Sequence, residues 1–104
     1  MEVRDIVAIC GSMNRAWESM KFAKISFERA GYIVLLPADP DSSGIFTGEP
    51  FISKELLTAM HYKRIAMATI VYICNVGGYI GESTQMEIEF ARGLNIPVYF
   101  AYPM

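Results

Sequence analysis

The sequence predicts a small α/β domain in which helices cover both faces of a parallel sheet, and three observations support this prediction. Four short apolar runs are nearly continuous rather than alternating, which is typical of strands buried on both faces. Helical patterns separate these runs, so crossover connections are expected to join the strands. The composition is 53% hydrophobic and only 19% charged, which suits such an interior.

The predicted strands are "DIVAIC", "YIVLLP", "TIVYIC" and "IPVYFA", at residues 5–10, 32–37, 69–74 and 96–101. We expect a doubly wound, flavodoxin-like or Rossmann-like sheet of four to five strands in the order 2-1-3-4. Such a sheet has a ligand crevice beyond the carboxyl ends of its strands, near the point where the strand order reverses. The loops that follow the strands are therefore the places to look for a site.

Three helices are predicted between these strands. The first has an apolar stripe from Ala16 to Ala30, and Gly31 stands where a helix would end. The second is expected from about Ser53 to Ala68, and the third from near Thr84 to Gly93. On the second helix the residues that share one face are Leu57, His61, Ile65 and Ala68. Residues 38–52 are rich in turn-forming residues without an apolar period, so they are predicted to form a long loop.

Length and composition limit the classes of function. The 104 residues suit one domain, 1–104, and the net charge of −2 lacks the basic cluster of a nucleic-acid-binding protein. No apolar run is long enough to cross a membrane and no signal sequence is recognisable, so a cytoplasmic protein is expected. Cys10 and Cys74 are expected to be buried and reduced, and two cysteines fall short of a zinc ligand set.

The loop after the first strand, "CGSMNR", offers Gly11 for close backbone approach and the Ser12 hydroxyl. Free N–H groups at the start of the following helix could hold an anion, although Ser12 or Asn14 could instead only cap that helix. No G-x-G-x-x-G motif and no Walker lysine occur, so no cofactor is predicted. After the second strand, Asp39 is a candidate binding residue, and Asp39 and Asp41 are candidate acids or residues of ordinary turns.

The loop after the third strand, "NVGGYIGEST", is the richest in candidate binding residues. Its glycines permit positive φ angles and leave space for a ligand against the main chain. The predicted binding residues of this segment are Asn75, Gly77, Gly78, Gly81, Ser83 and Thr84.

Glu87 follows this loop and has two interpretations. In the first, "TQME" is a capping box, in which Thr84 caps the helix and Glu87 bonds back to the Thr84 N–H. In the second, Glu87 is a nucleophile that the helix macrodipole keeps ionised. Helical spacing places Glu87 with Ala91 and Leu94 on the side toward the sheet, whereas Glu89 should face water.

Taken together, "ICGSM", "GYIVLLP" and the segment from 60 to 100 resemble the nucleoside 2-deoxyribosyltransferase-like superfamily, particularly small bacterial members. This superfamily also contains nucleotide N-glycosidases. The resemblance covers nearly the whole chain except 38–52, and its most specific part is the glycine-rich loop followed by M-E-[IL]-x-x-A. It implies that Glu87 attacks an anomeric carbon, that Gly11 and Ser12 contribute to the sugar or phosphate pocket, and that the protein is a homodimer or larger.

The sequence departs from this family at two positions. Thr69 stands where an aspartate is usual, and His61 stands about where another acidic residue is expected. The acid that protonates the leaving base is therefore unassigned. His61 is a candidate for that role, since histidine titrates near neutral pH, but a histidine on an apolar helix face is also a common packing residue.

We therefore expect cleavage or transfer of the N-glycosidic bond of a nucleoside or nucleoside monophosphate, with Glu87 and His61 as candidate catalytic residues. The expected partner is a small molecule, with no nucleic acid and no membrane. A non-catalytic nucleotide-binding module on the same fold is the alternative, which the absence of aspartate at position 69 favours modestly. A third possibility is a structural assembly subunit, suggested by the unprotected sheet edge that "PVYFAYPM" would present.

Overall fold

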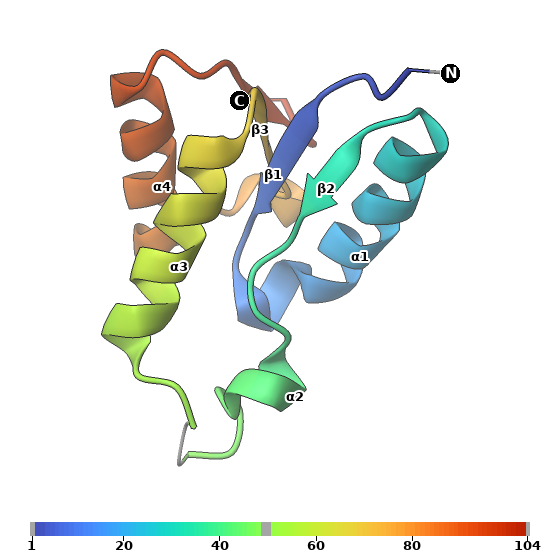
Figure 1. Cartoon of the computed structure of the whole chain (residues 1–104). Coiled ribbons are helices and arrows are strands. Elements are labelled where there is room, and N and C mark those ends of the chain that lie inside the picture. The colour runs from blue at the N-terminus through green and yellow to red at the C-terminus, as the bar shows by residue number, and fades with distance from the viewer. Residues whose placement is uncertain (1, 49–50, 104) are drawn as a thin grey trace.

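The computed structural model describes residues 2–48 and 51–103. In these residues four parallel strands form one sheet in the order β2-β1-β3-β4 (Figure 1). The strands are β1 (Ile6–Cys10), β2 (Ile33–Leu35), β3 (Ile70–Ile73) and β4 (Val98–Phe100). The predicted α/β class and strand order are confirmed. Each strand is shorter than its apolar run, because the ends of the runs leave the ladder and enter loops.

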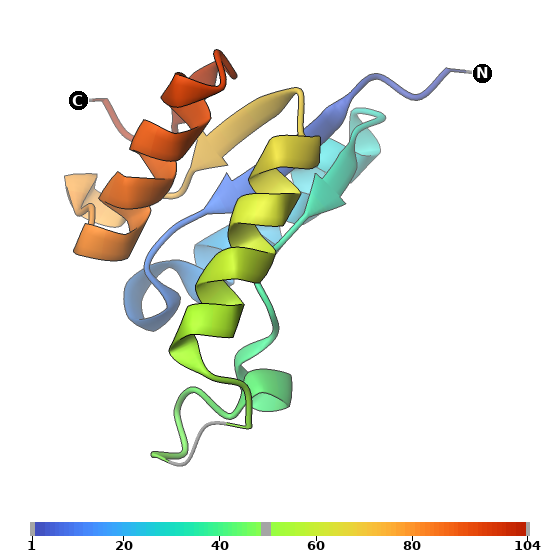
Figure 2. The same ribbon diagram turned by 60° about the vertical axis from the view of Figure 1, so that its left-hand side comes forward.

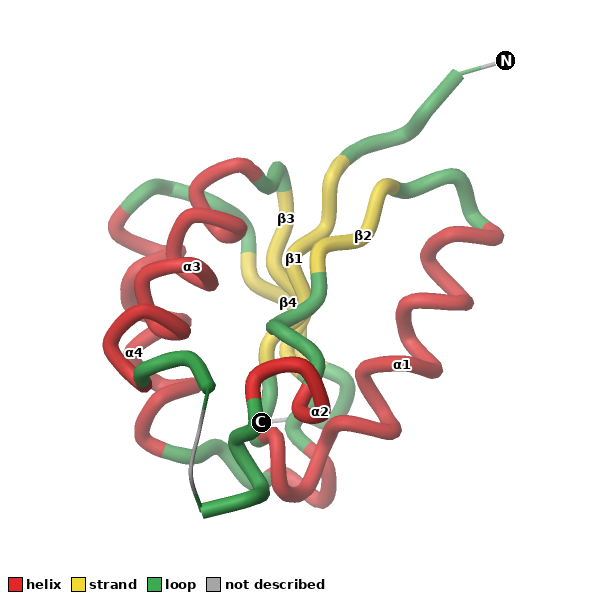
Figure 3. The backbone as a smooth tube through the Cα atoms, turned by 60° about the horizontal axis from the view of Figure 1, so that its bottom comes forward, coloured by secondary structure: helices red, strands yellow, loops and turns green. Residues whose placement is uncertain are grey.

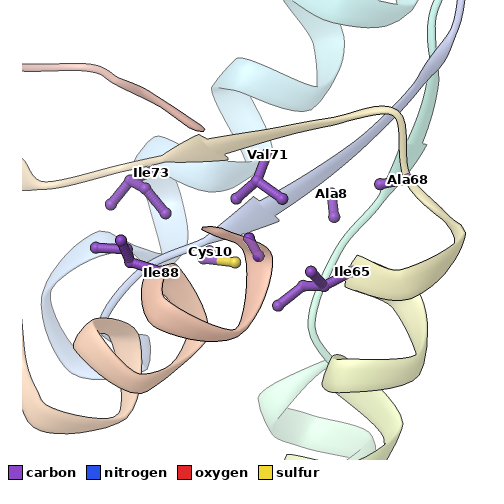
Figure 4. Close-up of a cluster of buried hydrophobic side chains, with 8 residues drawn as sticks. Ala8, Cys10, Ile65, Ala68, Val71, Ile73 and Ile88 are labelled. Carbon is purple, nitrogen blue, oxygen red and sulfur yellow. The ribbon is translucent and has the colours of Figure 1, made fainter. Parts of the chain in front are cut away.

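The three longer helices are α1 (Met13–Arg29), α3 (Lys54–Met67) and α4 (Glu82–Gly93). Helix α1 covers one face of the sheet, and α3 and α4 lie side by side on the other (Figures 2 and 3). Side chains of strand β1 pack on both faces of the sheet, because successive side chains point to opposite sides. Val7 and Ile9 pack toward α1, while Ala8 and Cys10 pack among residues of α3 and α4 (Figure 4).

Helix α1 ends where the sequence predicts, through a Schellman motif. Gly31 has a φ of 95°, its N–H bonds the Glu28 carbonyl, and the Tyr32 N–H bonds the Phe27 carbonyl. Helix α4 ends at the predicted Gly93, but its left-handed residue is Asn95, with a φ of 60°. Asparagine tolerates this conformation better than other residues that carry a Cβ.

The start of α4 corrects one expectation. The helix begins at Glu82 with Gly81 as its N-cap, so Thr84 lies inside the first turn and caps nothing. The predicted capping box of Thr84 and Glu87 does not form, because Glu87 lies in the second turn of α4 rather than at the third helical position. Leu94 also departs from expectation: 47% of its surface is exposed, rather than packed toward the sheet.

The segment 38–52 was predicted to be a loop throughout. This prediction is partly wrong, because the segment contains the short helix α2 (Pro40–Ser43). Its residues 49 and 50 lie outside the described part. The glycine-rich loop likewise contains a 3₁₀ turn, η1 (Val76–Gly78). In the described residues no helix has the length and apolarity that a membrane span requires.

Cys10 and Cys74 are free, buried thiols, as expected. Strands β1 and β3 are neighbours, but Cys10 packs among the α3 and α4 residues and Cys74 among those of α1. The sheet therefore separates the two sulfur atoms, and they cannot form a disulfide without moving a central strand.

Candidate functional site

A cavity of about 480 Å³ lies at the carboxyl edge of the sheet, where the sequence predicts the site. The loops after β1, β2 and β3 all contribute to its wall, and α3 and α4 complete it. Of the predicted site residues, those that line the cavity are Gly11, Ser12, His61, Gly81, Ser83, Thr84 and Glu87.

Gly11 lets the loops after β1 and β3 approach each other. A Cβ atom at this position would lie 3.1 Å from the Cys74 carbonyl oxygen and 3.1 Å from Ala16 Cβ. A larger residue would therefore push the loop away from the neighbouring strand. This close contact brings the start of α1 to the wall of the cavity.

The start of α1 has the chemistry of an anion-binding surface. Ser12 is the N-cap, yet its hydroxyl makes no capping hydrogen bond, so it is available to a ligand. The first turn of α1 carries no acidic residue, and the positive end of the helix dipole is therefore uncompensated there. Lys54, at the start of α3, adds a cationic side chain to the wall of the same cavity.

Glu87 is the partly buried carboxylate of the cavity, and it lies against Cys10 and His61. One ligand-type atom from each of these three side chains lies within 4.8 Å of the other two. Burial raises the pKa of Glu87 to about 7, against the effect of a hydrogen bond from the Cys10 thiol, which lowers it. In the interpretation of Glu87 as a nucleophile the helix macrodipole favours its ionised form, but burial outweighs this effect, which declines beyond the first turn.

His61 is buried beneath the cavity with both ring nitrogens engaged. Its Nε2 lies 3.1 Å from the Ile9 carbonyl oxygen, which can only accept, so Nε2 carries the hydrogen. Its Nδ1 lies 3.5 Å from Arg64 Nη1, a group that can only donate. Burial and the Arg64 guanidinium lower the pKa of His61 to about 4. His61 is therefore neutral near pH 7, which favours the packing interpretation over that of an acid.

Cys10, His61 and Glu87 are also a combination of side chains that can bind a transition metal. The hydrogen bonds of His61 do not fit this use. A metal on Nε2 would displace the bond to Ile9 and transfer the hydrogen to Nδ1, which would then face the Arg64 guanidinium. Metal-bound histidines normally direct that second N–H to an acceptor. We assign no metal to the cluster.

Four predicted binding residues do not line the cavity. Asp39 caps α2 by accepting the Asp41 N–H at 2.8 Å. Asn75 is buried and bonds the main chain of Tyr102 twice, at 2.9 and 3.1 Å. Gly77 and Gly78 adopt positive φ angles in η1, where they shape the turn. Asp39 and Asn75 are thus structural in this fold, and the two glycines serve the path of the chain.

Several lining residues were not predicted from the sequence, among them Lys54, Phe46 and Tyr79. Tyr79 lies under the Arg15 guanidinium, whose central carbon is 4.0 Å from the ring centroid. Phe46 is 55% exposed, on the segment between α2 and α3. Each is an ordinary residue in its local sequence, so only the meeting of distant loops identifies it.

Position 69, where the family usually has an aspartate, lies far from the cavity. Thr69 precedes β3, at the amino edge of the sheet, and the cavity lies at the opposite edge. There its hydroxyl bonds both the N–H and the carbonyl of Ile6, at 3.2 and 3.0 Å. The absence of aspartate at position 69 therefore does not argue against chemistry in the cavity.

Comparison with known proteins adds no assignment to this geometry. No protein-family model matches the chain. No curated protein matches it with significant similarity. The function is therefore argued from the cavity alone.

Proposed function

We propose that this protein cleaves or transfers the N-glycosidic bond of a nucleoside or nucleoside monophosphate, with Glu87 as the nucleophile. One observation carries the proposal: a carboxylate with a pKa of about 7 lies in a cavity that also exposes the uncapped start of α1. The anion-binding surface suits a phosphate, and the carboxylate suits the anomeric carbon of the attached sugar.

The chemistry needs Glu87 in its ionised form. The carboxylate attacks C1′ of the sugar, the C–N bond breaks, and its electron pair leaves with the base, which takes a proton. Water then attacks the glycosyl ester, releases the sugar and restores the carboxylate. If a second base attacks instead, the result is transfer. With a pKa of about 7, roughly half of the Glu87 side chains are ionised at neutral pH.

His61 does not supply the proton to the leaving base near pH 7, because its pKa is about 4. Glu82 is an exposed residue in the first turn of α4 and lines the cavity, so solvent reaches this region. The base can therefore take its proton from water. Water is a weaker acid than a protonated side chain and assists departure of the base less. This also favours the alternative, a module that binds a nucleotide in the same cavity without cleaving it.

The test begins with a panel of nucleosides and nucleotides, with deoxynucleoside monophosphates first. Base release and thermal shift are both measured. Base release supports the enzyme, and a thermal shift without base release supports the binding module. If neither occurs with any compound of the panel, both proposals fail.

Glu87→Gln tests the role of the nucleophile. The substitution removes the charge but keeps the shape, so base release should fall by orders of magnitude, about 10³-fold or more. The matched control is Glu89→Gln, because Glu89 lies on the same helix and is exposed. Its turnover should equal that of the parent protein. Unchanged turnover in folded Glu87→Gln would refute the assignment.

A further inference from the structure

We infer that Cys10 is a positioning residue for Glu87, whose carboxylate it holds toward the cavity by donating a hydrogen bond from its buried thiol. The catalytic meaning of this contact rests on the proposed function, whereas the contact itself can be tested without a substrate. Three features of the structure carry the inference.

The first feature is the rigidity of the donor. Cys10 is the last residue of β1, a central strand, and its side chain is wholly buried among α3 and α4 residues (Figure 4). Its carbonyl oxygen accepts the Cys74 N–H at 2.8 Å, which ties the end of β1 to the end of β3. The sulfur atom is therefore fixed by the sheet rather than by a mobile loop.

The second feature is the direction of the thiol hydrogen. Sγ of Cys10 lies 3.4 Å from Nε2 of His61, and that nitrogen carries a hydrogen because it donates to the Ile9 carbonyl. His61 therefore cannot accept the thiol hydrogen. The Glu87 carboxylate can accept it, because one of its oxygens lies within 4.8 Å of Sγ in this cluster. His61 thus orients the thiol, and the thiol orients Glu87.

The third feature is the set of charges around Glu87. Helix α3 contributes neutral His61 and, behind it, Arg64, whose guanidinium lies against the His61 ring. Lys54 of α3 and Glu82 of α4 lie in the wall of the cavity. Strand β1 contributes Cys10. Burial and the nearby Glu87 raise the pKa of the Cys10 thiol well above its ordinary value. Cys10 therefore remains a donor throughout the range in which Glu87 titrates.

The experiment follows the titration of the Glu87 δ-carboxyl group by carbon-13 NMR in the parent protein, Cys10→Ala and Cys10→Ser. Cys10→Ala removes the donor to the ionised form, so the titration midpoint should rise, by up to about one pH unit. Cys10→Ser restores a hydroxyl donor and should return the midpoint to the parent value or below it. The control is Cys74→Ala, which removes a second buried thiol on the other face of the sheet and should leave the midpoint unchanged.

An unchanged midpoint in folded Cys10→Ala would overturn the inference, and so would a rise that Cys10→Ser does not reverse. A purely structural role would lower the thermal stability of Cys10→Ala without moving the Glu87 midpoint. Once a substrate is found, the acid limb of the kcat/KM profile should shift with the NMR midpoint. If the midpoint shifts but no compound in the panel is cleaved, the positioning contact stands and the proposed activity fails.

Discussion

At the scale of single residues, Glu87 shows how burial can reverse an expectation from local sequence. A carboxylate near a helix start is ordinarily stabilised in its ionised form. Here Glu87 lies one turn further in and is partly buried, and the cost of desolvating its charge raises its pKa to about 7. A side chain that titrates near neutral pH is suited to chemistry, but its charge destabilises the fold.

This cost predicts a pH dependence of stability. The folded-state pKa of Glu87 is raised from 4.5 to about 7, so its contribution to stability is fully present below about pH 4.5 and is lost as the pH rises through 7. Glu87→Gln removes this loss. Relative to the parent, we expect the variant to be more stable at about pH 8, by about 2 kcal/mol, and to show little difference at about pH 4.

Chemical denaturation at the two pH values measures this difference, with Glu89→Gln as the exposed control. The stability of each variant is compared with that of the parent protein at the same pH. This comparison is needed because His61 changes stability with pH in the opposite direction to Glu87, and it does so equally in parent and variant. Its pKa is lowered from 6.5 to about 4, so its stabilising contribution is lost as the pH falls through that range. A Glu87→Gln variant with no gain at the higher pH would contradict the raised pKa of Glu87.

At the scale of elements, the loop after β3 has divided roles. Its first part, Asn75 and η1, anchors and turns the chain, whereas its second part, from Tyr79 to Thr84, reaches the cavity. The anchor is the pair of hydrogen bonds between the Asn75 amide and the main chain of Tyr102. Through it, the segment after β4 is attached to the carboxyl end of β3.

Asn75→Ala should therefore lower the free energy of unfolding, by about 1–3 kcal/mol, because it removes two bonds of a wholly buried amide. Chemical denaturation measures the loss, and hydrogen exchange should show early opening near Tyr102. Gln85→Ala, at an exposed position of α4, is the control and should change stability by less than about 0.5 kcal/mol. A parent-like Asn75→Ala protein would show that other contacts hold this segment.

At the scale of the whole molecule, the two faces of the sheet are covered unequally. Of the three longer helices in the described residues, α3 and α4 lie on one face and α1 lies on the other (Figure 3). Tyr99 of β4, which pairs with Tyr72, is 55% exposed, and Phe22 of α1 is 74% exposed. Large exposed aromatic side chains on one molecule are typical of surfaces that associate.

We therefore predict a homodimer or larger assembly in solution, as the resemblance also implies. Light scattering at tens of micromolar should give at least twice the chain mass of 11.7 kDa. A monomer mass across that concentration range would contradict this prediction. The residues of one chain would then have to form the whole binding site.

The sequence by itself determined the α/β class, the strand order and the approximate bounds of the longer helices. These features depend on hydrophobic periodicity and on local signals such as Gly31, which act over a few residues. It also predicted a site at the carboxyl edge of the sheet, because parallel strands place all their following loops there, and the cavity lies at that edge. Glu87 became a candidate from its position on the inner side of a helix and from the family resemblance, and its catalytic role stays a prediction.

Only the tertiary structure decided what surrounds Glu87. Cys10 and His61 are 51 residues apart in sequence, and no local pattern shows that they meet at one carboxylate. Likewise, the sequence predicts Asn75 as a binding residue, whereas in the fold its amide bonds the main chain of Tyr102, 27 residues away. The pKa of a buried group depends on desolvation and on every charge packed around it. These quantities arise from contacts between distant segments, so the surroundings and the pKa of Glu87 were decided by the fold rather than by the motif.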